Sequence, residues 1–365
     1  MQWPESHDGQ YAKKYLSPLV EQGISPFIRN VSASMQVLKI DDIVLPLIIA
    51  TDNYSDTWVC SVSTLYVSYP LQTLHLIGNP LLQFLAKQVV GGIGKIGRRG
   101  NLNSVIYVND WLFSVDLYPQ GLTKEKIRRI IQLLKNRFPR HALVFRSLTE
   151  KTNAKLMDDL QKEGCRLLAS RSVFFTDSNN PELYTTRIIK SDMKLWKEKN
   201  HQVVDGLQLT DLETERVLEL YRKLYIDNHS NLNPLVTLEF IKHLIQNKLF
   251  HIRALKVNGV IEGVVGFIIK DSVMMCPLFG YDKSLDNSNQ IYRLLSTCLL
   301  LEAKENKCLF HQSAGGSFYK KIRRAVSFTE SMAIYTKHLP LQQKFPWFTL
   351  RTFINNFAIP YMQKY

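Results

Sequence analysis

The last third of the chain carries a histidine, an aspartate and a group of cations that could take part in group-transfer chemistry. His311 could act as a base near neutral pH, and Asp282 could orient or deprotonate an amine. The cations follow within one short stretch: Lys320, Lys321, Arg323 and Arg324. Such a cationic turn can hold phosphate groups through charge-assisted hydrogen bonds. Each feature also has a structural interpretation: a histidine hydrogen-bonded on a sheet, an aspartate capping a turn, and a solvated basic helix face.

A glycine-rich stretch over residues 91–100 offers a second possible phosphate site. Three of its glycines have the spacing G-x-G-x-x-G. A dinucleotide site needs a strand before this motif and a helix after it. Here a helical pattern over residues 80–90 comes first and a strand follows, which disfavours dinucleotide binding. A flexible anion-binding loop, with its backbone amides and two arginines, stays open.

The residues of the second half predict an α/β unit. Thr210 and Glu213 form a capping box at the start of one helix, and a second helix follows from Thr237. Asn258-Gly259 suits a type I′ turn between two antiparallel strands. The remaining elements are expected as a strand over 273–279, a helix over 289–305, a strand over 308–312, a basic helix over 318–324 and a strand over 332–335.

The first half predicts a similar unit. Its expected elements are strands over 37–40, 44–50 and 58–67, a helix over 80–90, a hairpin of 105–108 with 112–117, a helix from Thr123, a strand over 141–145, a helix over 152–162 and a strand over 171–175. The lysine-rich residues 191–201 are expected to join the two halves. We therefore expect two domains, residues 1–200 and residues 201–365, the second ending in a helical tail.

Composition limits the class of protein. The 365 residues are 45% hydrophobic, which is enough for two cores. No apolar run reaches the ~18 residues of a membrane span, and the N-terminus lacks the pattern of a secretory signal, so we expect a cytoplasmic protein. The five scattered cysteines form no C-x-x-C pair, so we expect reduced, mostly buried thiols and no metal site. A net charge of +14 favours an anionic partner.

Several short motifs in the second half carry a resemblance to a known family. They are Gly280-Tyr281-Asp282, Ile291-Tyr292-Arg293, His311-Gln312-Ser313-Ala314-Gly315-Gly316, Tyr319-Lys320-Lys321-Ile322-Arg323 and His338-Leu339-Pro340. Together they resemble the FemAB-related, BioF2-like branch of the GNAT acyltransferases, across residues 210–340. Tyr319 stands where that branch usually has Phe, and Arg324 replaces an expected Gly. The resemblance implies two tandem GNAT-like α/β domains, each a mixed, mostly antiparallel sheet flanked by helices, and it implies N-acyl transfer.

The resemblance also implies roles for particular residues. A gap between strands 273–279 and 308–312 would offer a backbone N–H to an oxyanion, with catalytic residues at its mouth: Tyr281, Asp282, His311 and Tyr319. Tyr319 would protonate the departing thiolate, with simple packing as its alternative. Donor contacts are expected from Ser313, Gly315, Gly316, Lys320, Lys321, Arg323 and Arg324. Acceptor contacts are expected from Asn228, His229, Asn231 and Asn233, which ordinary turn chemistry also explains.

The donor is the least determined part of this hypothesis. The GNAT loop that binds pyrophosphate should lie within residues 283–290, which contain no glycine. We expect an acyl thioester, on CoA or on an acyl carrier protein, to be transferred to an amine of a small molecule, a lipid or a cell-envelope precursor. A charged tRNA is the alternative donor, as in FemAB-type transferases. A non-catalytic GNAT-like binding protein is the third possibility.

Overall fold

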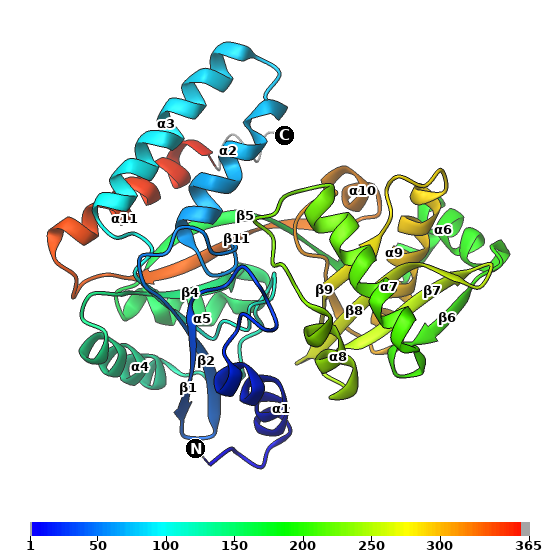
Figure 1. Cartoon of the computed structure of the whole chain (residues 1–365), viewed down its shortest axis with the longest axis horizontal. Coiled ribbons are helices and arrows are strands. Elements are labelled where there is room, and N and C mark those ends of the chain that lie inside the picture. Colours follow the sequence, from blue (N-terminus) through cyan, green and yellow to red (C-terminus); the bar gives the residue numbers. More distant parts are fainter. Residues whose placement is uncertain (1, 359–365) are drawn as a thin grey trace. The chain divides into compact units, whose positions relative to one another are not determined.

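The computed structural model describes residues 2–358, which form two compact units. Unit 1 contains residues up to Arg171, Leu232–Leu235 and residues from Thr329 onward, and unit 2 contains Ser172–Asn231 and Val236–Phe328. Strands β5 (Arg166–Asp177) and β11 (Val326–Tyr335) each contribute residues to both units. Each unit is a mixed, mostly antiparallel sheet with flanking helices, which confirms the expected fold class (Figure 1). The division into residues 1–200 and 201–365 stays a prediction.

The sheet of unit 1 has the strand order β1-β2-β3-β4-β11-β5. Its first four strands are β1 (Ser34–Ile40), β2 (Ile43–Ala50), β3 (Val105–Val108) and β4 (Ala142–Leu148). All neighbours among β1, β2, β3, β4 and β11 are antiparallel except β3 and β4. Helices α4 (Lys124–Arg137) and α5 (Glu150–Lys162) pack on this sheet. Thr123 caps α4 by accepting a hydrogen bond from the Lys126 amide, as the sequence predicts.

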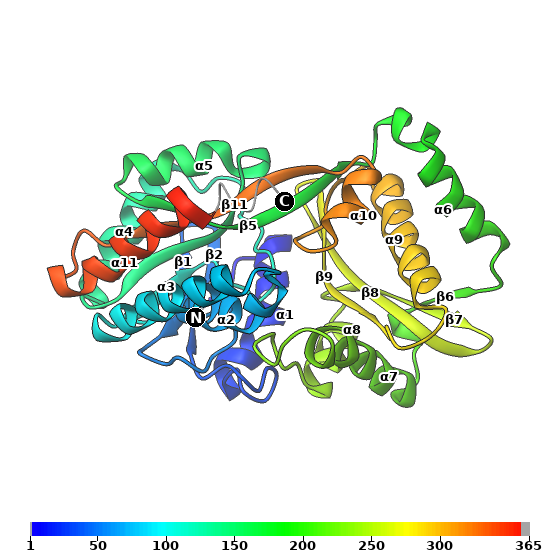
Figure 2. The same ribbon diagram turned by 90° about the horizontal axis from the view of Figure 1, so that it is seen from above.

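Four further helices belong to unit 1: α1 (His7–Gln22), α2 (Tyr69–Thr73), α3 (Pro80–Arg99) and α11 (Leu341–Phe353). Figures 1 and 2 show α11 lying alongside α3. The expectation of a loop over residues 91–100 is wrong, because α3 continues to Arg99. A Cβ on Gly94 would lie 2.8 Å from the Val67 side chain, and one on Gly100 would lie 2.3 Å from Pro346. These glycines therefore permit close packing of helices rather than a phosphate loop.

Two other expectations for unit 1 are also wrong. Residues 58–67 form turns and the start of a π-helical segment (Thr64–Ser68) instead of a strand. Residues 112–117 do not pair with β3, because the chain after Val108 folds around two buried carboxylates. Asp110 accepts a hydrogen bond from the Leu112 amide (2.8 Å), and Asp116 accepts one from the Trp111 amide (3.0 Å). These bonds satisfy backbone groups that a hairpin would otherwise pair.

The sheet of unit 2 has the order β5-β10-β9-β8-β7-β6. The strands are β6 (Gln202–Asp205), β7 (His251–Val257), β8 (Val260–Lys270), β9 (Val273–Tyr281) and β10 (Leu309–His311). The helices are α6 (Arg187–Glu198), α7 (Asp211–Arg222), α8 (Leu238–Gln246), α9 (Ser288–Glu305) and α10 (Ser317–Ile322). Short helical segments lie at Leu74–Leu76, Pro181–Thr185, Gly206–Gln208, Lys223–Asp227 and Ile354–Ala358.

Local sequence signals in unit 2 are confirmed. Thr210 and Glu213 make both hydrogen bonds of the capping box at the start of α7. Asn258 (φ 52°) and Gly259 (φ 81°) make the tight turn between β7 and β8. Helices α7 and α9 lie on opposite faces of β8 and β9 (Figure 2), since a Cβ on Gly280 would meet the α7 backbone and one on Gly263 would meet Leu295 of α9.

Candidate active site

Strands β9 and β10 diverge within unit 2. They pair in parallel over three residue pairs only, the last of which joins His311 to Met275. Beyond that point the chain after β10 bonds to β5, where the Gln312 amide donates to the Phe174 carbonyl (2.8 Å). β9 instead continues with β8 to Tyr281, through a bulge that sets Cys276 and Pro277 against Phe267. The expected divergence between these strands is present, and bulges often occur beside active sites.

Three tyrosines gather beside this divergence. Tyr281 ends β9, Tyr292 lies on α9 and Tyr319 lies on α10. The Tyr292 ring lies 5.6 Å from the Tyr281 ring and 4.6 Å from the Tyr319 ring, measured between centroids. The structure thus brings two predicted catalytic residues against one shared neighbour, to which the sequence analysis gave no role.

The Tyr319 hydroxyl has unusual surroundings for a polar group. It is buried and makes no hydrogen bond of good geometry with the described residues. Burial raises the pKa of Tyr319 to about 12, although the nearby Ser296 hydroxyl and the Arg323 charge oppose this shift. Burial likewise raises the pKa of Tyr281 to about 12. Both phenols are therefore neutral at pH 7 and keep a proton to donate.

Arg323 is held beside Tyr319 by a buried carboxylate. Its guanidinium carbon lies 3.4 Å from the centre of the Tyr319 ring. The same guanidinium donates two hydrogen bonds to Asp192 of α6, at 2.7 and 3.2 Å. Asp192 also accepts a hydrogen bond from Arg293 of α9 (2.7 Å). Asp192 thus links α6, α9 and α10, and the sequence analysis missed it because it treated this region as the join between domains.

Lys320 supports the turn before α10. Its buried ammonium group donates to the carbonyl oxygens of Gln312 (2.6 Å), Ser313 (3.2 Å) and Ala314 (2.9 Å). The predicted donor-binding residues Ser313, Gly315 and Gly316 all have positive φ in this turn. Lys321 and Arg324, by contrast, are exposed. Only these two predicted cations are therefore open to solvent, and a role for the set in donor binding stays a prediction.

Arg324 has a backbone conformation that favours glycine, with φ of 66°. We expect Arg324→Gly to raise the free energy of unfolding of unit 2 by about 0.5–1 kcal/mol, because the left-handed conformation costs a non-glycine residue more than glycine loses in entropy. Urea unfolding followed by the fluorescence of Trp196, in α6, measures this. Lys321→Gly, within α10, is the control and should lower the free energy by about 1 kcal/mol. Equal losses in both variants would contradict the prediction.

The other two predicted catalytic residues have different surroundings. His311 is buried, its Nδ1 accepts a hydrogen bond from the Ser313 amide (3.0 Å), and its ring lies 4.3 Å from Phe175. Asp282 accepts hydrogen bonds from Lys223 (2.5 Å) and from the Ser284 hydroxyl (2.6 Å). The Lys223 bond, then the Ser284 bonds, lower the pKa of Asp282 to about 2. This carboxylate is therefore a weak base at neutral pH.

The four residues predicted to contact the acceptor do not all belong to one unit. Asn228 donates to the Lys223 carbonyl, while His229 and Asn231 are exposed, all within unit 2. Asn233 is buried in unit 1, where its side-chain oxygen accepts a hydrogen bond from the Trp58 indole (2.9 Å). The loop's contact with an acceptor stays a prediction.

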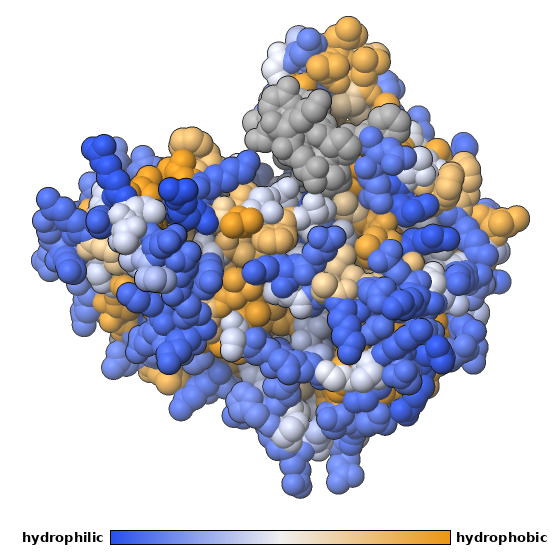
Figure 3. Space-filling view, turned by 180° about the vertical axis from the view of Figure 1, so that it is seen from behind, coloured by the Kyte–Doolittle hydropathy of each residue, from blue (hydrophilic) through white to orange (hydrophobic). Residues whose placement is uncertain are grey.

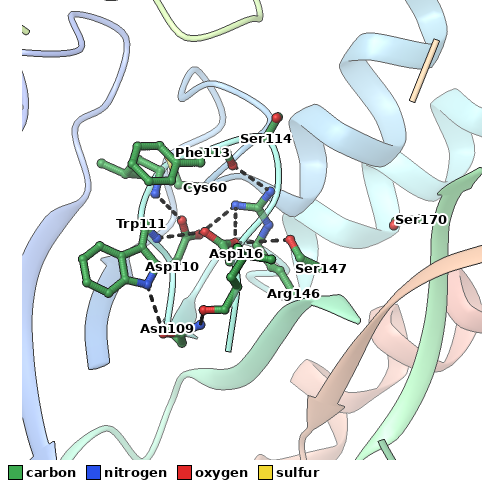
Figure 4. A network of polar contacts seen from close by, with 12 residues as sticks. Cys60, Asn109, Asp110, Trp111, Phe113, Ser114, Asp116, Arg146, Ser147 and Ser170 are labelled. Carbon is green, nitrogen blue, oxygen red and sulfur yellow. Dashed lines mark hydrogen bonds and ion pairs between the residues drawn. The ribbon is translucent and has the colours of Figure 1, made fainter. Parts of the chain in front are cut away.

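Unit 1 holds a polar cluster that the sequence analysis missed. Arg146 of β4 lies 3.1 Å from Asp110 and 3.5 Å from Asp116, and all three side chains are buried (Figure 4). The Ser147 hydroxyl donates to Asp116 (3.3 Å) from a backbone with φ of 57°. Here β4 bulges, with Arg146 and Ser147 facing the single residue Met332. Burial, and then the charge of Asp110, raise the pKa of Asp116 to about 8.

A second ion pair lies beside this cluster. Arg171 of β5 makes two hydrogen bonds to Glu330 of β11, at 2.9 and 3.2 Å. The guanidinium carbons of Arg171 and Arg146 lie 5.0 and 5.6 Å from the Trp58 ring centre. These residues line a small hollow in unit 1. No local motif marks these residues, because their partners are distant in sequence.

Residues 2–358 lack the features of two other kinds of site, a metal centre and a membrane span. In this part of the chain, no three His, Cys, Asp or Glu residues are grouped so that they could hold a metal ion. No helix among the same residues has both the length and the apolar character needed to cross a membrane.

Comparison with known proteins shows the fold. No protein-family model matches this sequence, and no curated protein matches it. Among solved structures, FemX is similar over 95% of this chain and 100% of its own, with 8% identity and a TM-score of 0.55. L-PGS from Bacillus licheniformis aligns with 68% of this chain and 82% of its own, at 11% identity and a TM-score of 0.49. A tandem GNAT protein from the clavulanic acid biosynthesis pathway covers 63% of this chain and 75% of its own, at 6% identity and a TM-score of 0.37.

Proposed function

We propose that this protein is a cytoplasmic N-acyltransferase that moves an acyl group from a thioester to an amine. The observation that carries this proposal is the divergence of β9 from β10, with Tyr281, Tyr292 and Tyr319 gathered beside it. A gap between two parallel strands leaves backbone groups available to a ligand, and an N–H there can stabilise the oxyanion that forms during acyl transfer. The FemX-like fold agrees with this proposal.

The residues suit the steps of such a reaction. The amine nitrogen attacks the thioester carbonyl carbon, the carbon–sulfur bond breaks, and the thiolate takes a proton. Tyr319 supplies that proton, because its buried phenol is neutral at pH 7. His311, at the end of β10, is the candidate that accepts the proton of the amine. Its Nδ1 accepts from the Ser313 amide, so Nδ1 would have to exchange this hydrogen bond for the amine. Asp282 forms an ion pair with Lys223, so it orients the loop that follows β9 and does not act as the base.

The donor that we favour is a thioester of CoA or of an acyl carrier protein, and the acceptor is an amine of a small molecule, a lipid or a cell-envelope precursor. The exposed Lys321 in α10 and Arg324 just after it, together with the +14 charge, suit the phosphates of either donor. An aminoacyl-tRNA is the second candidate donor, favoured by the absence of glycine from residues 283–290.

Mass spectrometry of mixed donor pools tests the proposal. The full chain is incubated with an amine library and, separately, acyl-CoA, acyl carrier protein or aminoacyl-tRNA. We expect enzyme-dependent loss of an acyl thioester and formation of an N-acyl product. If product formation needs tRNA and is abolished by ribonuclease, the donor is an aminoacyl-tRNA and not a thioester. Donors that all stay intact, with one of them bound, would indicate a non-catalytic binding protein.

A further inference from the structure

Helix α3 begins with an exposed apolar surface. Leu81 is 66% exposed and Phe84 58% exposed, although both are large hydrophobic residues. The full surface, here called the apolar tip, consists of Leu71, Leu81, Leu82, Phe84, Leu85 and Val89. Helix α3 carries its tip residues before Val90, its first buried residue. An exposed apolar cluster of this size indicates a binding surface.

The tip residues are arranged as in a helix that lies in a membrane interface. At about 100° per residue, the five tip residues of α3 occupy an arc of roughly 160°, with Gln83 and Lys87 on the other side. In Figure 1, α2 and the start of α3 project from the sheet of unit 1, and Figure 3 shows hydrophobic residues gathered at that end. Helix α11, whose start packs near the C-terminal end of α3, has an exposed apolar row of its own at Leu341, Phe345 and Phe348.

The segments that contain α3 and α11 carry charges of a single sign. Residues 57–109 contain no Asp or Glu, but they contain Lys87, Lys95, Arg98 and Arg99. These four cations are exposed along α3. Residues 331–358, which include α11, also lack acidic residues and contain Lys337, Lys344 and Arg351. The helix that carries the tip therefore combines an apolar surface with cations and has no carboxylate of its own, which complements an anionic surface.

From this combination we propose that the apolar tip inserts into the headgroup region of an anionic lipid bilayer. The apolar side chains gain by leaving water, and each nearby cation is attracted by the anionic lipids. A second copy of the chain fits this surface less well, because a symmetric contact would bring the same cations together. The inference rests on unit 1 alone and does not depend on the proposed transfer reaction.

Vesicle sedimentation with the full chain tests this inference. We expect the wild type to sediment with phosphatidylglycerol-containing vesicles and to bind pure phosphatidylcholine vesicles at least about tenfold less. Leu81→Glu/Phe84→Glu should weaken binding to the anionic vesicles by about tenfold or more, because it removes two apolar contacts and adds two negative charges. Binding should also fall as salt rises from about 0.1 to about 0.5 M.

The control is Leu212→Glu/Val260→Glu, which makes the same charge change at exposed apolar residues of unit 2. It should bind anionic vesicles as the wild type does. The inference is overturned if the wild type stays in the supernatant, or if the tip variant and the control bind equally. It is also overturned if light scattering shows a wild-type dimer that the tip substitutions convert to a monomer without any vesicle binding.

Discussion

Arg146→Met is expected to lower the free energy of unfolding of unit 1 by about 3–5 kcal/mol, because it leaves two buried carboxylates without their cation. Arg146 lies 3.1 Å from Asp110 and 3.5 Å from Asp116, and these three side chains are almost inaccessible to water. Methionine can fill much of the same space, so the lost free energy of unfolding comes mainly from the missing charge and less from a change in side-chain volume. Urea unfolding followed by tryptophan fluorescence measures it, since Trp58 and Trp111 both belong to unit 1.

The loss should grow with pH. Burial already raises the pKa of Asp116 to about 8, and that of Asp110 is also raised. Without Arg146 both values rise further, so above the wild-type pKa of each carboxyl the folded variant holds protons that the folded wild type has released, and the loss grows there. Stability conferred by a raised carboxyl pKa is fully present below the unfolded value near 4 and is lost as the pH rises through the folded value. The variant should therefore be closest to the wild type at acidic pH.

Arg128→Met is the matched control. Arg128 also makes two hydrogen bonds to a carboxylate, Glu163, at 3.0 and 2.8 Å, but its side chain is 57% exposed. An exposed pair contributes at most about 1 kcal/mol. If the two variants lose the same stability, or if the Arg146 loss does not change with pH, the buried cluster does not have the electrostatic role that we assign to it.

Sequence predicted best what neighbouring residues decide. The Thr210–Glu213 capping box and the Asn258-Gly259 turn involve residues at most three apart, so their chemistry can be read directly. The same holds for Thr123 at the start of α4. Glycine was ambiguous, because the spacing over residues 91–100 fits a loop as well as a helix. The deciding contacts, Val67 on Gly94 and Pro346 on Gly100, come from distant parts of the chain.

In the candidate site, too, the sequence predicted local features but not contacts between residues far apart in the chain. The motifs pointed to Tyr281 and Tyr319, and the structure places both against Tyr292. Sequence could not show that Lys320 would donate to the carbonyl oxygens of the preceding turn, or that Arg323 would pair with Asp192, 131 residues away. Nor could the sequence identify Lys223 as the cation that pairs with Asp282, because Lys223 lies 59 positions earlier. The types of residue at a site are thus readable from motifs, while their charge states depend on long-range partners.

Tyr319→Phe is expected to lower kcat by about 100-fold and to leave KM nearly unchanged, because it removes only the proton donor of the leaving thiolate. The ring keeps its contacts with Tyr292 and Arg323, so the free energy of unfolding should change by less than about 1 kcal/mol. Steady-state kinetics with the donor and acceptor found by mass spectrometry provide the measurement. Tyr184→Phe is the control: this tyrosine of unit 2 donates to the Ser178 carbonyl (2.8 Å), and kcat should stay at the wild-type value.

Donors with different leaving thiols can show whether Tyr319 acts as an acid or only packs against its neighbours. A thiol of lower pKa needs less protonation as it departs, so an aryl thioester should reduce the kcat deficit of Tyr319→Phe well below the deficit seen with an alkyl thioester. A residue that only positions α10 would give the same deficit with both donors. Because Arg323 lies 3.4 Å from the Tyr319 ring centre, its charge also stabilises the phenolate that remains after proton transfer. Equal deficits with the two thioesters, or no deficit at all, would show that Tyr319 is not the acid.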